Sequence, residues 1–174
     1  EFDLEAASAA LRPLIPKGLG VDEVAVRTAG TAALVPAIDA GRLLVNFAGH
    51  GSVESWTKHA SFGTDEAAGL VNGAALPFVV SMTCLNGLFD DVFSESLAEA
   101  FLKAPNGGAA AVWASSGLTE PEPQSALNQE LFRRLFRKGP VRLGDAVRRA
   151  KAAVDDGDVR RTWILFGDPT MTLR

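Results

Sequence analysis

The chain has 174 residues, enough for one domain whose core buries roughly 70% of the surface of the unfolded chain. Its composition, 47% hydrophobic and 22% charged, is typical of a globular protein. The net charge of −4 excludes a general attraction to nucleic acids or anionic membranes. No apolar run approaches the ~20 residues that a membrane-spanning helix needs, and a single cysteine cannot form an internal disulfide.

The first half of the chain is expected to alternate between helices and strands. We predict a helix over 4–15, a strand over 21–26, a helix over 31–40, a strand over 43–48, a polar loop over 52–74 and a strand over 78–83. Thr31 is the expected N-cap of the second helix, and Gly41 is its expected C-terminal stop.

The second half continues the same alternation. We predict a helix over 94–104 with Ser94 as its N-cap, a strand over 109–114, a loop over 115–123, helices over 124–138 and about 143–154, and a strand over 163–166. Strands that alternate with helices of this length predict an α/β fold with a mostly parallel sheet. The strand segments are continuously apolar, which indicates that helices cover both faces of the sheet. No linker or internal repeat divides residues 1–174, so we expect a single domain.

Two of the predicted strands end at residues that can perform chemistry. His50 follows the strand over 43–48, and Cys84, the only cysteine, follows the strand over 78–83. Parallel sheets place their functional groups at the carboxyl ends of strands, and a thiolate beside an imidazole is an activated nucleophile. Gly51 allows close backbone approach, and its N–H together with that of Cys84 could form an oxyanion hole.

Each of these residues also has an ordinary structural interpretation. A cysteine with apolar neighbours is usually a small core residue, and a histidine between glycines can simply occupy a turn. The second histidine, His59, lies in a polar stretch and is expected to be exposed to solvent. Eight of the 17 basic residues fall between Arg133 and Lys151, but without interleaved aromatic residues they predict a solvated helical face rather than a nucleic-acid site. The sequence has no C-x-x-C or H-E-x-x-H motif for zinc and no G-x-S-x-G motif of a serine hydrolase.

The two strand-end motifs resemble those of a known family. The segment 46–52, Asn-Phe-Ala-Gly-His-Gly-Ser, followed by Trp56, resembles the histidine motif of the gingipain-type cysteine peptidases. The segment 83–89, Thr-Cys-Leu-Asn-Gly-Leu-Phe, resembles their nucleophile motif, and 96–100 resembles the helix after it. The segments 107–116 and 163–169 resemble the wall of the primary specificity pocket and the end of the catalytic domain. The matches keep the family's order over about 42–174.

The resemblance implies a three-layer, caspase-like α/β fold with a mostly parallel sheet flanked by helices. It also implies a cysteine endopeptidase that acts through a thioester acyl-enzyme. His50 would be the general base and acid, and Cys84 would be the nucleophile. Gly51 and Cys84 would supply the backbone N–H groups of the oxyanion hole. Three further residues would line the substrate cleft: Trp113, Ala114 and Ser115.

The resemblance also implies parts that this chain does not contain. Basic specificity would depend on an acidic residue of an upstream strand, and the carboxylate near the catalytic histidine would lie in the same region. We therefore expect residues 1–174 to be a fragment, the second half of a catalytic domain, whose partners are protein or peptide substrates and the preceding part of the same protein. The family implies a secreted or cell-surface location. Members of the family can also bind structural calcium, but no cluster of ligands here has readable spacing, and we expect no cofactor.

Two other functions are compatible with the same motifs. A non-catalytic caspase-fold module could keep both motifs and serve binding or assembly. A cysteine hydrolase or acyltransferase could use the same pair of residues on a small substrate.

Overall fold

A four-stranded sheet forms the centre of the computed structural model, which describes residues 2–57 and 62–173. The strand order is β1 (Leu44–Ala48), β4 (Phe78–Met82), β5 (Ala111–Ser115) and β6 (Trp163–Gly167). The first three strands are parallel, and β6 is antiparallel to β5. The prediction of a mostly parallel sheet is therefore confirmed.

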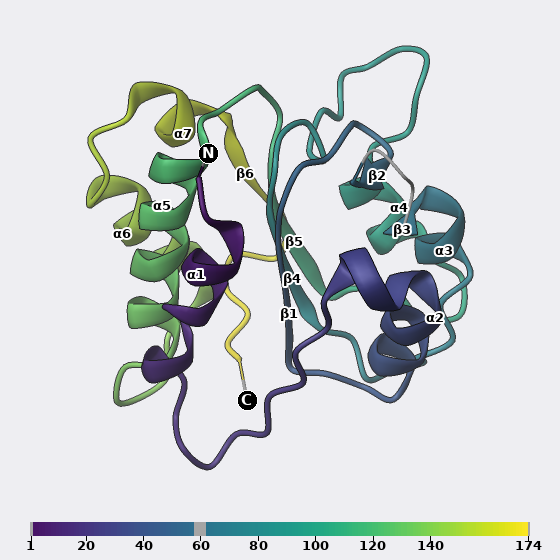
Figure 1. The fold of residues 1–174 in the computed structure, drawn as a ribbon, viewed down its shortest axis with the longest axis horizontal. Coiled ribbons are helices and arrows are strands. Elements are labelled where there is room, and N and C mark those ends of the chain that lie inside the picture. The colour runs from purple at the N-terminus through teal and green to yellow at the C-terminus, as the bar shows by residue number, and fades with distance from the viewer. Residues whose placement is uncertain (1, 58–61, 174) are drawn as a thin grey trace.

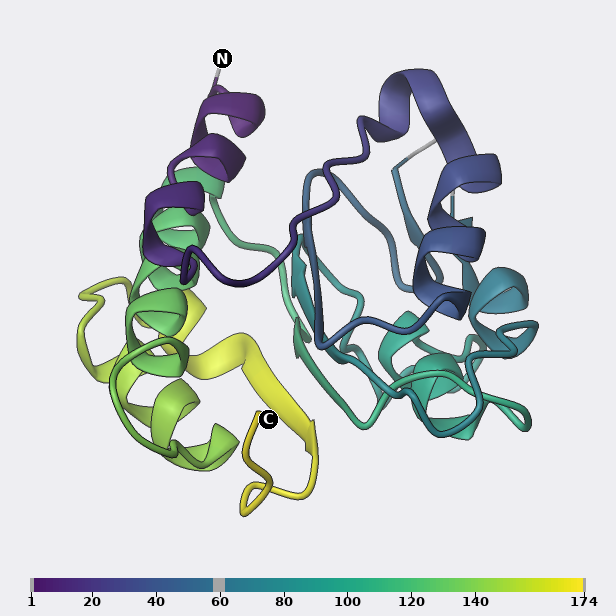
Figure 2. The same cartoon turned by 90° about the horizontal axis from the view of Figure 1, so that it is seen from below.

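Helices cover both faces of this sheet, which gives three layers (Figure 1). One face carries α1 (Leu4–Ala9), the short 3₁₀ helix η1 (Arg12–Leu14), α5 (Pro121–Leu135), α6 (Leu143–Ala152) and α7 (Gly157–Thr162). The other face carries α2 (Val26–Asp39), α3 (Thr64–Ala68), α4 (Leu97–Lys103) and the small antiparallel pair β2 (Ser55–Trp56) and β3 (Phe62–Gly63). The same layers are seen from below in Figure 2, where α1 again lies alongside α5.

The central strand β4 shows why its sequence is continuously apolar. Phe78, Val80 and Met82 pack into the core on the side of α5 and α6, whereas Val79 packs into the core on the side of α2 and α4. All five residues of the strand are buried. A strand that is covered on both faces loses the alternation of polar and apolar residues that a half-exposed strand would show.

The expected ends of the helices are partly correct. Gly41 follows the C-cap of α2 and has a φ of +80°, as the predicted C-terminal stop requires. The N-cap of α4 is Ser96 and not Ser94, because the Ser96 hydroxyl and the Glu99 side chain form a capping box. Burial tends to raise the pKa of Glu99, but the hydrogen bonds from Ser96 and Lys103 outweigh this effect and leave the pKa below its ordinary value.

Three segments differ from the expected elements. Residues 21–25 form no strand; instead Asp22 pairs with Arg42 (2.6 Å), and the helix expected to start at Thr31 already begins at Val26. The stretch 52–74, expected to be a loop, contains β2, β3 and α3. The short helix α7 was not predicted from its polar sequence; its N-cap Asp156 accepts from Val159 N–H (2.8 Å). Such short elements form because their few apolar residues are buried against the sheet, which local periodicity does not reveal. In the part of the chain that the structure describes, no helix has the length and apolar character needed to span a membrane.

Candidate active site at the carboxyl edge of the sheet

His50 and Cys84 occupy equivalent positions beyond two neighbouring strands. Ala48, the last residue of β1, is in register with Met82, the last residue of β4. His50 and Cys84 each follow two residues later, and the ladder extends past the strands through Gly49 N–H, which donates to Met82 O (3.1 Å). Because neighbouring strands lie about 4.8 Å apart, this register brings the two residues to the same point of the sheet edge.

The turn that contains His50 packs directly against the residue before the cysteine. A Cβ atom placed on Gly51 would lie 2.6 Å from Thr83 Oγ1 and 2.9 Å from Ser55 O. Real Cβ atoms essentially never approach other atoms this closely, so only glycine fits here without a shift of the backbone. The absence of a side chain at Gly51 therefore allows the two motifs to touch.

The thiol of Cys84 is partly buried and contacts the loop that follows β5. Cys84 Sγ donates to Thr119 O (3.5 Å), and Gln124 Nε2 lies 3.9 Å from the same sulfur. His50 is exposed, and within residues 2–57 and 62–173 no hydrogen bond to its imidazole is present. The imidazole is therefore free to interact with a substrate or with another part of the protein.

The backbone N–H groups at this edge that have no acceptor among the described residues include those of His50, Gly51 and Cys84. Gly51 forms an isolated antiparallel bridge with Trp56, in which Ser52 N–H donates to Ser55 O (2.9 Å) and Thr57 N–H donates to His50 O (2.7 Å). In this pattern the N–H of the central residue points away from the partner strand. The N–H of Gly51 is therefore available on the side away from β2.

The chain turns sharply after the cysteine. Leu85 has a φ of +65°, a left-handed conformation that costs a residue with a side chain roughly 1–2 kcal/mol. Hydrogen bonds on either side hold it there: Leu85 N–H donates to Gly117 O (3.3 Å) and Gly87 N–H donates to Ser115 O (2.8 Å). A strained backbone that the surrounding structure stabilises is common at functional sites.

A buried network, which the sequence did not predict, links the two motifs. Trp56 Nε1 donates to Ser81 Oγ (2.7 Å), and this hydroxyl donates to Asn86 Oδ1 (2.7 Å). Asn86 Nδ2 donates to the carbonyls of Ser52 (2.6 Å) and Ser55 (3.3 Å), on the histidine side. The sequence offers one signal for this network, the polar Ser81 inside an otherwise apolar strand. Asn86 thus joins the cysteine turn to the segment after His50.

Replacing Asn86 with leucine should destabilise the protein by about 1–3 kcal/mol, because Ser81 Oγ and the Ser52 carbonyl would lose partners in a buried site. Denaturant unfolding measures this loss. Asn106 lies in an exposed turn, so Asn106→Ala is the control and should stay within about 0.5 kcal/mol of the parent protein. Equal unfolding free energies for Asn86→Leu and the parent protein would show that the network does not stabilise the fold.

The three residues expected to line a substrate cleft are buried. Trp113, Ala114 and Ser115 each have no exposed surface, and the Trp113 ring packs edge-on against Trp163 in the core. The reason is that β5 lies between β4 and β6 and has helices on both faces. The side chains of these three residues are therefore enclosed in the core, whereas the loop after them, 116–120, contacts Cys84 and Leu85 through the carbonyls of Thr119 and Gly117. The other histidine, His59, lies outside the described residues.

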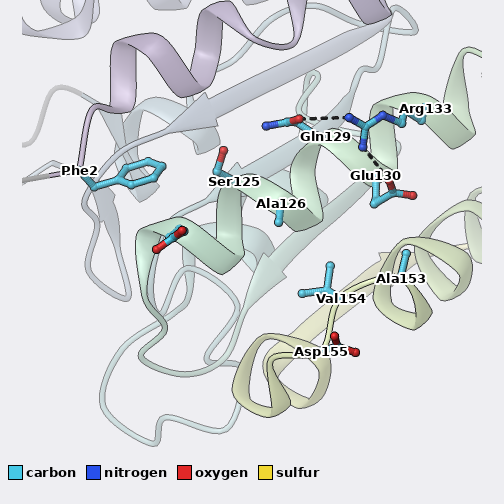
Figure 3. Close-up of a pocket in the computed structure, with 10 residues that line it drawn as sticks. Phe2, Ser125, Ala126, Gln129, Glu130, Arg133, Ala153, Val154 and Asp155 are labelled. Carbon is cyan, nitrogen blue, oxygen red and sulfur yellow. Dashed lines mark hydrogen bonds and ion pairs between the residues drawn. The ribbon is translucent and has the colours of Figure 1, made fainter.

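In the part of the chain that the structure describes, neither the best-defined hollow nor a metal site adds a functional group beside Cys84. A hollow of about 440 Å³ lies between α5 and the α6–α7 connection, with Phe2 at its rim and Arg133 bonded to Glu130 (2.6 Å) and Gln129 (3.2 Å) inside it (Figure 3). Neither His50 nor Cys84 lines it. Among the described residues, no group of three or more His, Cys, Asp or Glu side chains could hold a metal ion.

Comparison with known proteins identifies relatives over most of the chain. The model of peptidase family C25 matches residues 16–174. Gingipain R2 of Porphyromonas gingivalis is 32% identical over 157 residues, which is 81% of this chain but 21% of the relative. Gingipain R1 of the same organism is also 32% identical over 157 residues, covering 81% of this chain and 15% of the relative. The chain thus spans about a fifth or less of the length of these relatives.

Solved structures agree with the observed architecture. The crystal structure of the Arg specific cysteine proteinase gingipain R superposes with a TM-score of 0.80, at 24% identity, over 98% of this chain and 43% of that chain. The complex of the pro- and mature domains of RgpB from P. gingivalis superposes with a TM-score of 0.83, at 23% identity, over 100% of this chain and 44% of that chain. The predicted three-layer, caspase-like α/β fold is confirmed.

Proposed function

The chain belongs to peptidase family C25, the gingipain-type cysteine peptidases, and on this basis we propose that it contains the His–Cys centre of a cysteine endopeptidase. The observation that supports this most directly is the register of β1 with β4, which brings His50 and Cys84 to one point of the sheet edge. The packing of Gly51 on Thr83 keeps the two turns in contact there.

The proposed reaction uses groups of this chain in two steps. The His50 imidazole takes the Cys84 proton, and the thiolate attacks the carbonyl carbon of the scissile peptide bond. The N–H groups of Gly51 and Cys84 donate to the oxyanion that forms. The His50 imidazolium then gives its proton to the leaving amine, and a thioester remains. Water attacks this thioester with His50 as base, which releases the carboxylic acid product and restores the thiol.

We propose arginine as the preferred residue before the cleaved bond. Its support is the similarity to relatives described as Arg specific. The acidic residue that would bind the guanidinium, and the carboxylate beside the catalytic histidine, would come from the preceding part of the same protein. That part would also be the main partner of this chain, and peptides or proteins would be the substrates. The loop 116–120 follows β5 and lies beside Cys84, because the Cys84 thiol donates to Thr119 O.

Digestion of a peptide library by the full-length protein tests this proposal. We expect cleavage after arginine, detected by mass spectrometry of the products, and no cleavage by the Cys84→Ala variant. Cleavage after other residues would contradict the proposed preference only. If the protein hydrolyses small esters and no peptide, it is a small-molecule hydrolase. If it cleaves neither and binds peptide equally well with and without the Cys84 thiol, it is a binding module.

A further inference from the structure

A buried amide, which the reaction above does not use, lies beside the nucleophile. Gln124 is in the first turn of α5 and only 4% exposed. Its Nε2 donates to the backbone oxygen (3.0 Å) and to Oγ1 (2.9 Å) of Thr119 and lies 3.9 Å from Cys84 Sγ. A carbonyl oxygen can only accept hydrogen bonds, so the nitrogen and not the oxygen of the amide must face Thr119 and the sulfur.

The thiol and the amide meet at the same oxygen. Cys84 Sγ donates to Thr119 O (3.5 Å), which also accepts from Gln124 Nε2. When the thiol loses its proton, the sulfur can only accept, and the Thr119 carbonyl becomes a repulsive neighbour. Gln124 Nε2 is then the side-chain donor already adjacent to the sulfur. Hydrogen bonds to a charged atom are stronger than those between neutral groups, so the amide gains more from the thiolate than from the thiol.

The local backbone holds Gln124 firmly in this place. α5 starts at Pro121 and has a second proline at 123, positions where the missing N–H costs no helical hydrogen bond. The Gln124 N–H donates to Glu120 O (3.2 Å), the first hydrogen bond of the helix. The loop 116–120 leads into α5, and its first part is held by the hydrogen bond from Leu85 N–H to Gly117 O. The amide therefore approaches the sulfur from a rigid helix start.

We propose that Gln124 is a positioning residue for Cys84: it holds Thr119 against the thiol and donates an N–H to the thiolate. The proposal rests on the proposed function, in which the proton passes from Cys84 Sγ to His50 and Gln124 keeps both of its amide protons. The titratable groups that the chain places next to this site are His50, two residues beyond the end of β1, and Glu120, next to Thr119; both are exposed.

The rate of Cys84 alkylation by iodoacetamide, followed against pH in the full-length protein by mass spectrometry of the Cys84 peptide, tests this role without any substrate. For Gln124→Met, which keeps the length of the side chain but removes the donor, we expect the midpoint of the profile to rise by about one pH unit, with about tenfold slower alkylation near pH 7. Gln129→Met, the same substitution on an outer face of α5, should leave the profile unchanged.

Two further variants make the result decisive. Thr119→Val removes only the hydroxyl acceptor and should keep the parent midpoint, because the carbonyl and the amide remain. Gln124→Glu also lacks the donor and fills the same space; it should raise the midpoint at least as much as Gln124→Met, and it replaces that variant if thermal unfolding shows that the latter does not fold. An unchanged midpoint in the Gln124 variants, or an equal rise in Thr119→Val, overturns the proposal. A rise in a protein that cleaves no peptide supports the positioning role and rejects the peptidase function.

Discussion

Replacing Cys84 with alanine should lower the rate of peptide hydrolysis by about 10⁴–10⁶-fold, because the reaction then has no nucleophile that can form the acyl-enzyme. His50→Ala should cause a loss of similar size, since the thiol would have no base and the leaving amine no acid. These losses are measured as kcat/KM on an arginine peptide with the full-length protein, together with thermal unfolding to show that the fold is intact.

The combination of the two substitutions separates a catalytic pair from two independent residues. Groups that act in one step are strongly non-additive, so the double variant Cys84→Ala/His50→Ala should be no slower than either single variant. His59→Ala is the matched control, because it removes the only other imidazole of the chain, and it should keep full activity. If His50→Ala also keeps full activity, the general base is another group.

The second large effect is expected at Gly51. The Cβ of alanine would lie 2.6 Å from Thr83 Oγ1 and 2.9 Å from a backbone oxygen, that of Ser55. Overpacking a tight site typically costs about 1–3 kcal/mol, and a displacement of about 1 Å at a catalytic group can cost about 10²-fold in rate. We therefore expect Gly51→Ala to lower both the free energy of unfolding and kcat/KM by these amounts.

Gly157 offers a control for this substitution. It begins α7, has no atom within 4 Å of an added Cβ and has no positive φ. Gly157→Ala should therefore keep the parent activity and leave stability unchanged or raise it by up to about 1 kcal/mol through reduced entropy of the unfolded chain. If Gly51→Ala matches Gly157→Ala in both measurements, the contact between the two turns is not needed for the site.

Arginine preference and the His–Cys reaction would depend on different parts of the protein. In the proposed site, the register of β1 with β4 places His50 and Cys84 just beyond two neighbouring strand ends, where the proposed acyl transfer would take place. Cys84 does not line the hollow beside α5, and the side chains of the cleft residues expected on β5 are buried. We therefore expect substitutions in the preceding part of the protein to change specificity, while substitutions around Cys84 change the rate for all substrates.

The sequence by itself determined the strands that build the site. The apolar runs at β4 and β5 are continuous because every residue of these two strands is buried, and this signal is local. It therefore predicted a mostly parallel α/β sheet and placed His50 and Cys84 at the ends of two strands. The segments 21–26 and 52–74 were predicted incorrectly because the pairing of a short strand or a single helical turn depends on which surface covers it.

Only the tertiary structure decided how the two motifs are held together. Three features join residues about thirty positions apart in the chain. They are the register of β1 with β4, the contact of Gly51 with Thr83, and the hydrogen bond from Asn86 Nδ2 to Ser52 O. Gln124 lies 40 residues from Cys84 and touches its sulfur only because α5 starts beside the sheet edge. Such contacts depend on packing between elements, which residue periodicity does not encode. For this reason the sequence predicted the pair that we propose to react, whereas the buried polar groups around it were visible only in the fold.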